Sequence, residues 1–183
     1  VYAAMGTKVT IVEFLPNIVP VEDEDVSKEL AKQYKKLGIE ILTSSSVESV
    51  DTKGKGCKVS VKTPSGNQEI NCDIVLSAAG VISNLENIGL EEVGIIVDKG
   101  KIPVSAYYET NIPGYYAIGD VTPGPALAHV ASAEGIICAE KLAGHKTEPL
   151  DYTNIPGCTY CSPEIASVGM TEKKAKEAGY DIK

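Results

Sequence analysis

The first eighty residues combine short β-type runs with one helical pattern. Residues 8–14 (KVTIVEF) alternate β-branched and polar side chains, which is typical of a strand. Val26, Leu30 and Tyr34 then recur at helical spacing, and a second β-type run follows over residues 39–42. A strand–helix–strand order of this kind predicts a parallel sheet.

Several further β-type runs follow in close succession. They cover residues 47–50, 57–63, 68–72 and 74–78. The tetrapeptide Pro64-Ser65-Gly66-Asn67 has the composition of a hairpin turn and lies between two of these runs. We therefore expect an antiparallel layer beside the parallel sheet, in a chain of the α/β class.

The periodicity weakens between residues 80 and 111 and returns near residue 115. Residues 115–118 form a β-type run that ends in Gly119-Asp120. A loop rich in proline and glycine then leads into an alanine-rich helix predicted over residues 126–143. Small side chains on this helix allow close approach to a neighbour or a ligand.

The last part of the chain has a short α+β pattern. β-type residues occur over 157–161 and 165–169, and Thr171 is placed to cap a final helix that ends at Gly179. The chain therefore divides into three modules, with expected limits at residues 1–80, 81–147 and 148–183.

Composition and charge narrow the class of partner. The 183 residues carry 25 acidic and 17 basic side chains, a net charge of −8, which argues against nucleic acid and against anionic membrane surfaces. The sequence has no apolar run long enough to span a membrane and no secretory signal. Five scattered cysteines and no Asn-x-Ser/Thr site favour a reducing, cytoplasmic location.

Glu13 is the first candidate for a ligand contact. It lies at the carboxyl end of the strand predicted over residues 8–14. In dinucleotide-binding βαβ units an acid at this place binds the adenosine ribose hydroxyls, about 20 residues after a glycine-rich turn. No G-x-G-x-x-G motif occurs in the sequence, so the spacing leaves open a solvated strand-end carboxylate.

Asp120 occupies the same position relative to its own predicted strand. Open α/β sheets bind ligands at the carboxyl ends of their strands, and a carboxylate there can hold a polyol hydroxyl. The alternative is a helix N-cap or turn residue. The helix start that follows, near residues 126–129, offers backbone N–H groups and a positive dipole end to an anionic ring or phosphate.

Other chemistry has little support in the sequence. Cys158 and Cys161 form a C-x-x-C motif, but no second pair or nearby histidine completes a zinc site. Both cysteines fall within the β-type run over residues 157–161, where residues three apart point to opposite faces, which disfavours a mutual disulfide. With His129 and His145 as the sole histidines, a catalytic triad has few ways to form. We expect no metal site and no catalytic residue in this chain.

Five sequence blocks, in order, resemble the flavin-dependent pyridine nucleotide-disulfide oxidoreductases. The blocks are Lys8–Phe14, Asp73–Gly80, Thr110–Asp120, Leu127–Gly135 and Ile155–Thr171. The YAIGD sequence within the third block is shared across the wider family. Leu127-Ala128-His129, followed by Glu134-Gly135, and an acid at position 13 narrow the resemblance to members that oxidise dihydrolipoamide.

The resemblance implies a chain that begins inside a dinucleotide-binding domain lacking its first strand and glycine-rich turn. A central flavin-contacting segment and the start of an α+β dimerisation domain follow. On the NAD side, it implies that Glu13 holds the adenosine ribose and repels the 2′-phosphate of NADP. It also implies that Val47 lines the adenine pocket and that Gly80 passes close to the nicotinamide nucleotide.

On the FAD side, the resemblance implies that Asp120 binds the ribityl chain. It also implies that four residues present backbone to the edge of the flavin ring: Ala126, Leu127, Ala128 and His129. In the family that the chain resembles, electrons pass from dihydrolipoamide through a redox disulfide and the flavin to NAD. The implied partners are a second copy of the full-length chain and the lipoyl-bearing subunit of a 2-oxo acid dehydrogenase or glycine cleavage complex.

The cysteine pair spaced by four residues and the His-Glu base pair of this family do not occur in the sequence. We therefore expect the 183 residues alone to form no NADH from dihydrolipoamide and to retain FAD weakly. Two alternatives stay open: another disulfide or NADH oxidoreductase of the superfamily, such as a glutathione or mercuric reductase, and a non-catalytic nucleotide-binding module.

Overall fold

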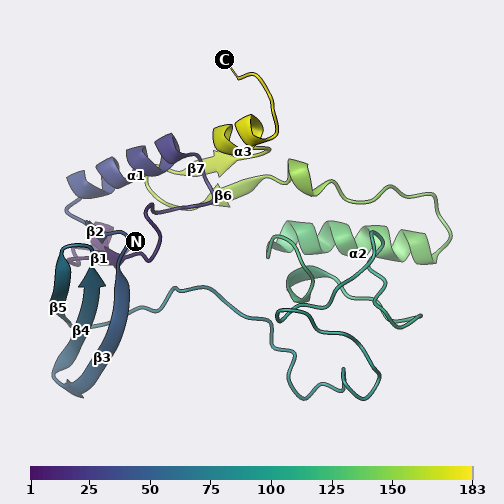
Figure 1. Cartoon of the computed structure of the whole chain (residues 1–183), viewed down its shortest axis with the longest axis horizontal. Coiled ribbons are helices and arrows are strands. Elements are labelled where there is room, and N and C mark those ends of the chain that lie inside the picture. The colour runs from purple at the N-terminus through teal and green to yellow at the C-terminus, as the bar shows by residue number, and fades with distance from the viewer. Residues whose placement is uncertain (183) are drawn as a thin grey trace. The chain divides into compact units, whose positions relative to one another are not determined.

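The computed structural model describes residues 1–182, which form two compact units (Figure 1). One unit comprises Val1–Ser77 together with the chain from Pro156 onward, and the other comprises Ala78–Ile155. Within the described residues, no helix has the length and apolar character needed to cross a bilayer.

The first unit contains the predicted parallel pair of strands. β1 (Thr10–Val12) and β2 (Glu40–Leu42) pair in parallel, and α1 (Glu24–Lys36) connects them. Leu30 of α1 is 2% exposed and packs with Ile18 in a buried cluster. Burial of the apolar face of α1 stabilises this unit, and the parallel pairing of β1 with β2 confirms the predicted strand–helix–strand order.

A three-stranded antiparallel sheet follows in the same unit and confirms the predicted hairpin. It consists of β3 (Ser46–Gly54), β4 (Gly56–Thr63) and β5 (Gly66–Cys72), with β4 in the middle. The turn between β4 and β5 is the dipeptide Pro64-Ser65. Val61 in the central strand is fully buried, so the sheet has one apolar face.

The prediction of a strand over residues 74–78 is wrong. These residues form no strand, and the Ile74 side chain is 82% exposed. β propensity depends on a neighbouring strand and a buried face, and this segment has neither in the described structure.

The chain from Pro156 onward adds three short elements to the first unit. These are β6 (Gly157–Thr159), β7 (Ile165–Ser167) and α3 (Glu172–Glu177), with β6 and β7 paired antiparallel. Ile165 of β7 packs in the same buried cluster as Leu30. The sequence pattern predicted these elements, and the cluster shows where they pack.

The second unit is mostly irregular around one helix. It contains the 3-10 turns η2 (Gly119–Val121) and η3 (Tyr152–Asn154) and the helix α2 (Ala128–Leu142). The prediction of a strand over residues 115–118 is wrong. In the described residues, β pairing there is limited to one bridge between Tyr116 and Glu109. Without a neighbouring strand along its length, a β-type run does not form a ladder.

Small residues allow α2 to lie close to the segment that carries η2. A Cβ built on Gly119 would lie 3.1 Å from the Ala131 Cβ, and one built on Gly135 would lie 3.2 Å from the Ile118 Cδ1. Gly119 also has a φ of +73°, which favours glycine. The close approach expected from the alanine-rich helix is therefore present.

Candidate functional site

Glu13 follows β1 directly and continues its pairing with β2. Its backbone N–H donates to the Leu42 carbonyl at 2.8 Å, so Glu13 stands at the carboxyl end of the parallel pair. The side chain is half-buried, and its Oε1 accepts a hydrogen bond from the Leu15 N–H at 2.8 Å. An ionised carboxylate has about four acceptor sites, so capacity remains for ligand hydroxyls.

The structure brings Val47 into the neighbourhood of Glu13. The Glu13 carbonyl accepts a hydrogen bond from the Ser45 N–H at 3.0 Å, two residues before Val47. Ser45 is 2% exposed, whereas the Val47 side chain near the start of β3 is 48% exposed. An acceptor and an exposed apolar side chain therefore lie near one strand end.

Gly80 belongs to the second unit. It is exposed and has a φ of +101°, a backbone conformation that favours glycine. Its contact with a nicotinamide nucleotide stays a prediction.

Asp120 lies in the middle of η2, within the second unit. Its carbonyl accepts hydrogen bonds from the Ser83 Oγ at 2.8 Å and from the Lys101 Nζ at 2.5 Å. The side chain is exposed, and Ile118 rather than Asp120 occupies the N-cap position of η2. The backbone of this turn is therefore anchored while the Asp120 carboxylate faces outward.

Glu134 of α2 is a buried carboxylate beside this turn, and the sequence pattern assigned it no structural role. It is 1% exposed, and its Oε2 accepts a hydrogen bond from the Gly119 N–H at 2.5 Å. Its Oε1 accepts another from the Tyr152 hydroxyl at 2.5 Å. The signal available in the sequence was an acidic residue inside an alanine-rich, predominantly apolar helix, where an unpaired charge would be costly to bury.

The pKa values of two tyrosines near Glu134 are raised. Burial and the hydrogen bond to Glu134 raise the pKa of Tyr152 well above its usual value. Burial also raises the pKa of Tyr108, which is 2% exposed. Both phenols therefore stay protonated at neutral pH, and Tyr152 stays a hydrogen-bond donor to Glu134.

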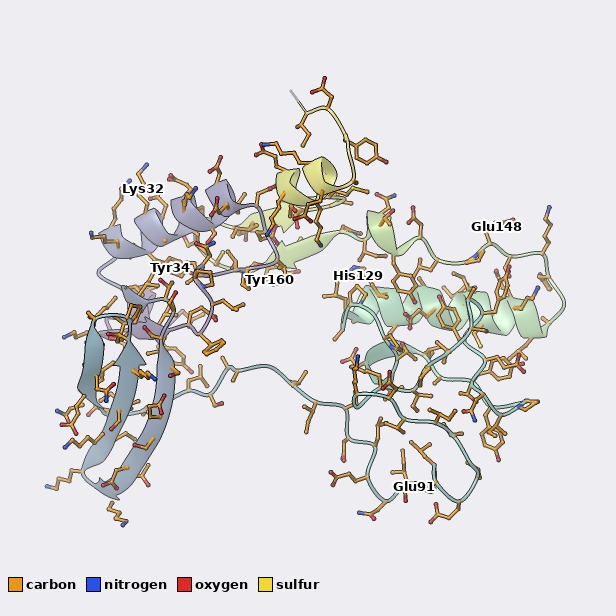
Figure 2. All side chains as sticks on the ribbon, viewed as in Figure 1. Lys32, Tyr34, Glu91, His129, Glu148 and Tyr160 are labelled. Carbon is orange, nitrogen blue, oxygen red and sulfur yellow. The ribbon has the colours of Figure 1, made fainter. Side chains whose placement is uncertain are left out.

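The start of α2 lies in the same unit as Asp120. Leu127 is the N-cap residue, and its N–H donates to the Pro125 carbonyl at 3.0 Å. Ala126, Ala128 and His129 are exposed, and Figure 2 shows His129 at this end of the helix. The predicted flavin-facing residues thus share the second unit with Asp120, beside a positive helix end.

The C-x-x-C motif differs from its predicted geometry. β6 ends at Thr159, so Cys161 lies outside the strand, and its Sγ donates to the Pro163 carbonyl at 3.0 Å. Cys158 and Cys161 are both free thiols. Within residues 1–182, no group of three or more His, Cys, Asp or Glu side chains is arranged to hold a metal ion.

A hollow of about 500 Å³ lies between α1 and β2 and contains none of the predicted site residues. Lysines of α1, among them Lys28 and Lys32, line it. The candidate ligand contacts are therefore strand-end and turn residues and do not line this hollow.

Comparison with known proteins identifies the family. The sequence profile described as pyridine nucleotide-disulphide oxidoreductase matches residues 1–135. The chain belongs to this family. The profile of the dimerisation domain of the pyridine nucleotide-disulphide oxidoreductases matches residues 155–183.

Individual members of the family match along almost the whole chain. The dihydrolipoyl dehydrogenase of Rhizobium etli is 46% identical over 184 residues, which cover 100% of this chain and 38% of the relative. The crystal structure of LpdA from Mycobacterium tuberculosis superimposes with a TM-score of 0.87 at 28% identity, over 97% of this chain and 38% of that one. The HOCl-induced flavoprotein disulfide reductase RclA from Escherichia coli has a TM-score of 0.88 at 27% identity, over 99% of this chain and 41% of that one.

The 183 residues thus span about two fifths of the length of the relatives that they match. The profile of the pyridine nucleotide-disulphide oxidoreductases matches residues 1–135 of this chain. That region includes both candidate ligand contacts, Glu13 and Asp120.

Proposed function

We propose that this chain supplies the NAD-binding edge and a flavin-binding turn of an enzyme that oxidises dihydrolipoamide and reduces NAD. The observation that carries this proposal is the 46% identity, along the whole chain, to a dihydrolipoyl dehydrogenase. The carboxylate at the end of the parallel strand pair and the anchored turn at Asp120 are the structural features that support it.

On the NAD side, Glu13 would accept hydrogen bonds from the adenosine ribose hydroxyls. The hydrogen bond from the Leu15 N–H holds one of its carboxylate oxygens at the strand end. A negative charge at this place repels a 2′-phosphate, so the site favours NAD over NADP. Val47 would contact the adenine ring, and Gly80 would lie beside the nicotinamide nucleotide.

On the FAD side, Asp120 would bind the ribityl chain. The backbone carbonyl is already bound by Ser83 and Lys101, and the carboxylate is exposed. Ala126, Leu127, Ala128 and His129 would present backbone to the edge of the flavin ring. When bound, FAD supplies a ring that accepts and passes on an electron pair.

The cysteine pair and the base that act directly on dihydrolipoamide in this proposal are not among the 183 residues. The chain's own contribution is to bind and orient two cofactors. We further propose module limits at residues 80 and 147, a homodimer that uses the segment matched by the dimerisation profile, and a cytoplasmic location. The proposed macromolecular partner is a lipoyl-bearing subunit of a 2-oxo acid dehydrogenase or glycine cleavage complex.

The test uses protein expressed from the complete reading frame that encodes these residues. Purified protein is assayed for NADH formation from dihydrolipoamide and NAD, and for reduction of glutathione disulfide and Hg(II) by NADPH. Dihydrolipoamide oxidation with NAD supports the proposal. NADPH-dependent reduction of the other substrates, without lipoamide activity, would assign the chain to a different disulfide reductase.

A further inference from the structure

Glu134 is a buried carboxylate with no role in the proposed chemistry. It is 1% exposed, and each of its oxygens accepts a hydrogen bond from a different segment of the chain, Gly119 and Tyr152. Burying a carboxylate is costly unless its oxygens are hydrogen-bonded. These two bonds therefore tie α2 to the turn η2 and to η3.

The Gly119–Asp120 segment is held from both ends. The Gly119 N–H donates to Glu134, while the Asp120 carbonyl accepts from Lys101 and Ser83. With its carbonyl bound to Lys101 and Ser83, Asp120 is an exposed residue whose carboxylate can meet a ligand. A turn fixed in this way places the Asp120 Cβ at one position, from which the side chain extends.

Close packing puts Glu134 within reach of the turn. Ala131, one helical turn before Glu134, is the residue that a Cβ on Gly119 would approach to 3.1 Å. Residues three apart lie on the same face of a helix, so Ala131 and Glu134 face the turn together. A larger residue at position 119 or 131 would push the Glu134 carboxylate away from the Gly119 N–H.

We propose that Glu134 is a positioning residue for flavin binding, which fixes the Gly119–Asp120 backbone so that the Asp120 carboxylate meets the ribityl hydroxyls of FAD. This inference rests on the proposed function. It predicts that loss of the Glu134 acceptor weakens FAD binding through Asp120. If the role of Glu134 is structural alone, the loss affects folding and leaves the contribution of Asp120 to FAD binding unchanged.

The test measures the FAD dissociation constant of the apoprotein from the complete reading frame, by quenching of flavin fluorescence. Glu134→Met removes both acceptors at similar volume, and we expect FAD affinity to fall about tenfold, as for one charge-assisted hydrogen bond. Glu134→Gln keeps an oxygen for the Gly119 N–H and an amide donor for the Tyr152 oxygen, so it should restore most of the affinity. Glu140→Met, at an exposed position of the same helix, is the matched control.

A double-mutant cycle separates positioning from a structural role. Asp120→Asn alone should weaken FAD binding, and adding Glu134→Met to it should cost much less than Glu134→Met alone, because the positioned group is gone. Strictly additive losses, or unchanged FAD affinity in Glu134→Met, would overturn the inference. If Glu134→Met does not fold, Glu134→Asp replaces it, since its shorter side chain keeps the charge but draws it away from Gly119.

The same measurements distinguish failure of the inference from failure of the proposed function. If Asp120→Asn binds FAD as tightly as the parent protein, the assignment of Asp120 as a flavin contact is wrong. If Asp120→Asn weakens binding but Glu134→Met does not, only the role of Glu134 is wrong. A shift in the visible absorption bands of the bound flavin in Glu134→Met, absent in Glu140→Met, would add support for the positioning role.

Discussion

The Leu15 N–H donates a hydrogen bond to the Glu13 carboxylate oxygen Oε1 at 2.8 Å. The two residues follow β1, so this bond makes a local turn that holds the Glu13 side chain at the end of the strand. A carboxylate held in place before a ligand arrives loses little conformational freedom on binding. This relationship makes Glu13 the first residue to test.

Glu13→Gln should weaken NAD binding in protein from the complete reading frame. The amide oxygen can still accept from Leu15, but the charge-assisted hydrogen bonds to ribose are lost, so KM for NAD should rise about tenfold. The discrimination against NADP should also fall because the repulsive charge is gone. Glu40→Gln, at the amino end of β2, is the control, and equal KM values for NAD in both variants would contradict the role of Glu13.

The buried cluster in the first unit predicts a sharp contrast between two leucines of the α1 region. Leu30 is 2% exposed and Leu37 is 58% exposed. Leu30→Ala should lower the free energy of unfolding by about 3 kcal/mol because it leaves a cavity. Leu37→Ala should change it by less than about 0.5 kcal/mol. Urea unfolding followed by circular dichroism measures both, and similar values would contradict the observed packing.

Cysteine reactivity should follow burial and pH. Burial raises the pKa of the Cys138 thiol, and burial together with the neighbouring Cys57 raises that of Cys72. A raised pKa leaves less thiolate at neutral pH, so these thiols should react slowly with iodoacetamide and accelerate only as the pH rises well above 8. Cys158 is exposed and should be labelled first.

Peptide mapping after short labelling at several pH values measures these rates. The same labelling in urea is the control, because all five thiols should then react at similar rates. Labelling of Cys138 as fast as Cys158 in the folded chain would contradict the observed burial.

The 183-residue chain by itself should form no NADH from dihydrolipoamide. Its five cysteines include no pair spaced by four residues, so it cannot form the redox disulfide that the proposed reaction uses. Weak or absent FAD retention is expected as well. An assay of NADH formation by the purified chain, with added dihydrolipoamide, FAD and NAD, checks the first expectation. Sustained turnover would refute the proposal that other residues carry the thiol chemistry.

Short-range patterns predicted much of the secondary structure. The helical spacing before Leu37 corresponds to α1, and the Pro64-Ser65 turn lies between β4 and β5 as predicted. Thr171 caps α3 as expected, because its side chain accepts a hydrogen bond from the Lys174 N–H. These features depend on residues a few positions apart, which the sequence displays directly.

Predictions based on β propensity alone were wrong at residues 74–78 and 115–118. Both runs have the composition of strands, but a strand requires a partner at the correct register, and composition does not show whether a partner is present. The same limit applies to the β-type run over residues 157–161, where the observed strand ends at Thr159 and leaves Cys161 outside.

The sequence by itself determined the α/β class, the parallel pair with its helix, the hairpin and the family, because these depend on local periodicity and on ordered motifs. Only the tertiary structure decided that Glu134 reaches Gly119 and Tyr152, and that Ile165 packs with Leu30. Glu134 and Gly119 are 15 residues apart, and their contact depends on how closely α2 approaches the turn. That distance is set by the packing of small side chains from separate segments, which no local pattern encodes.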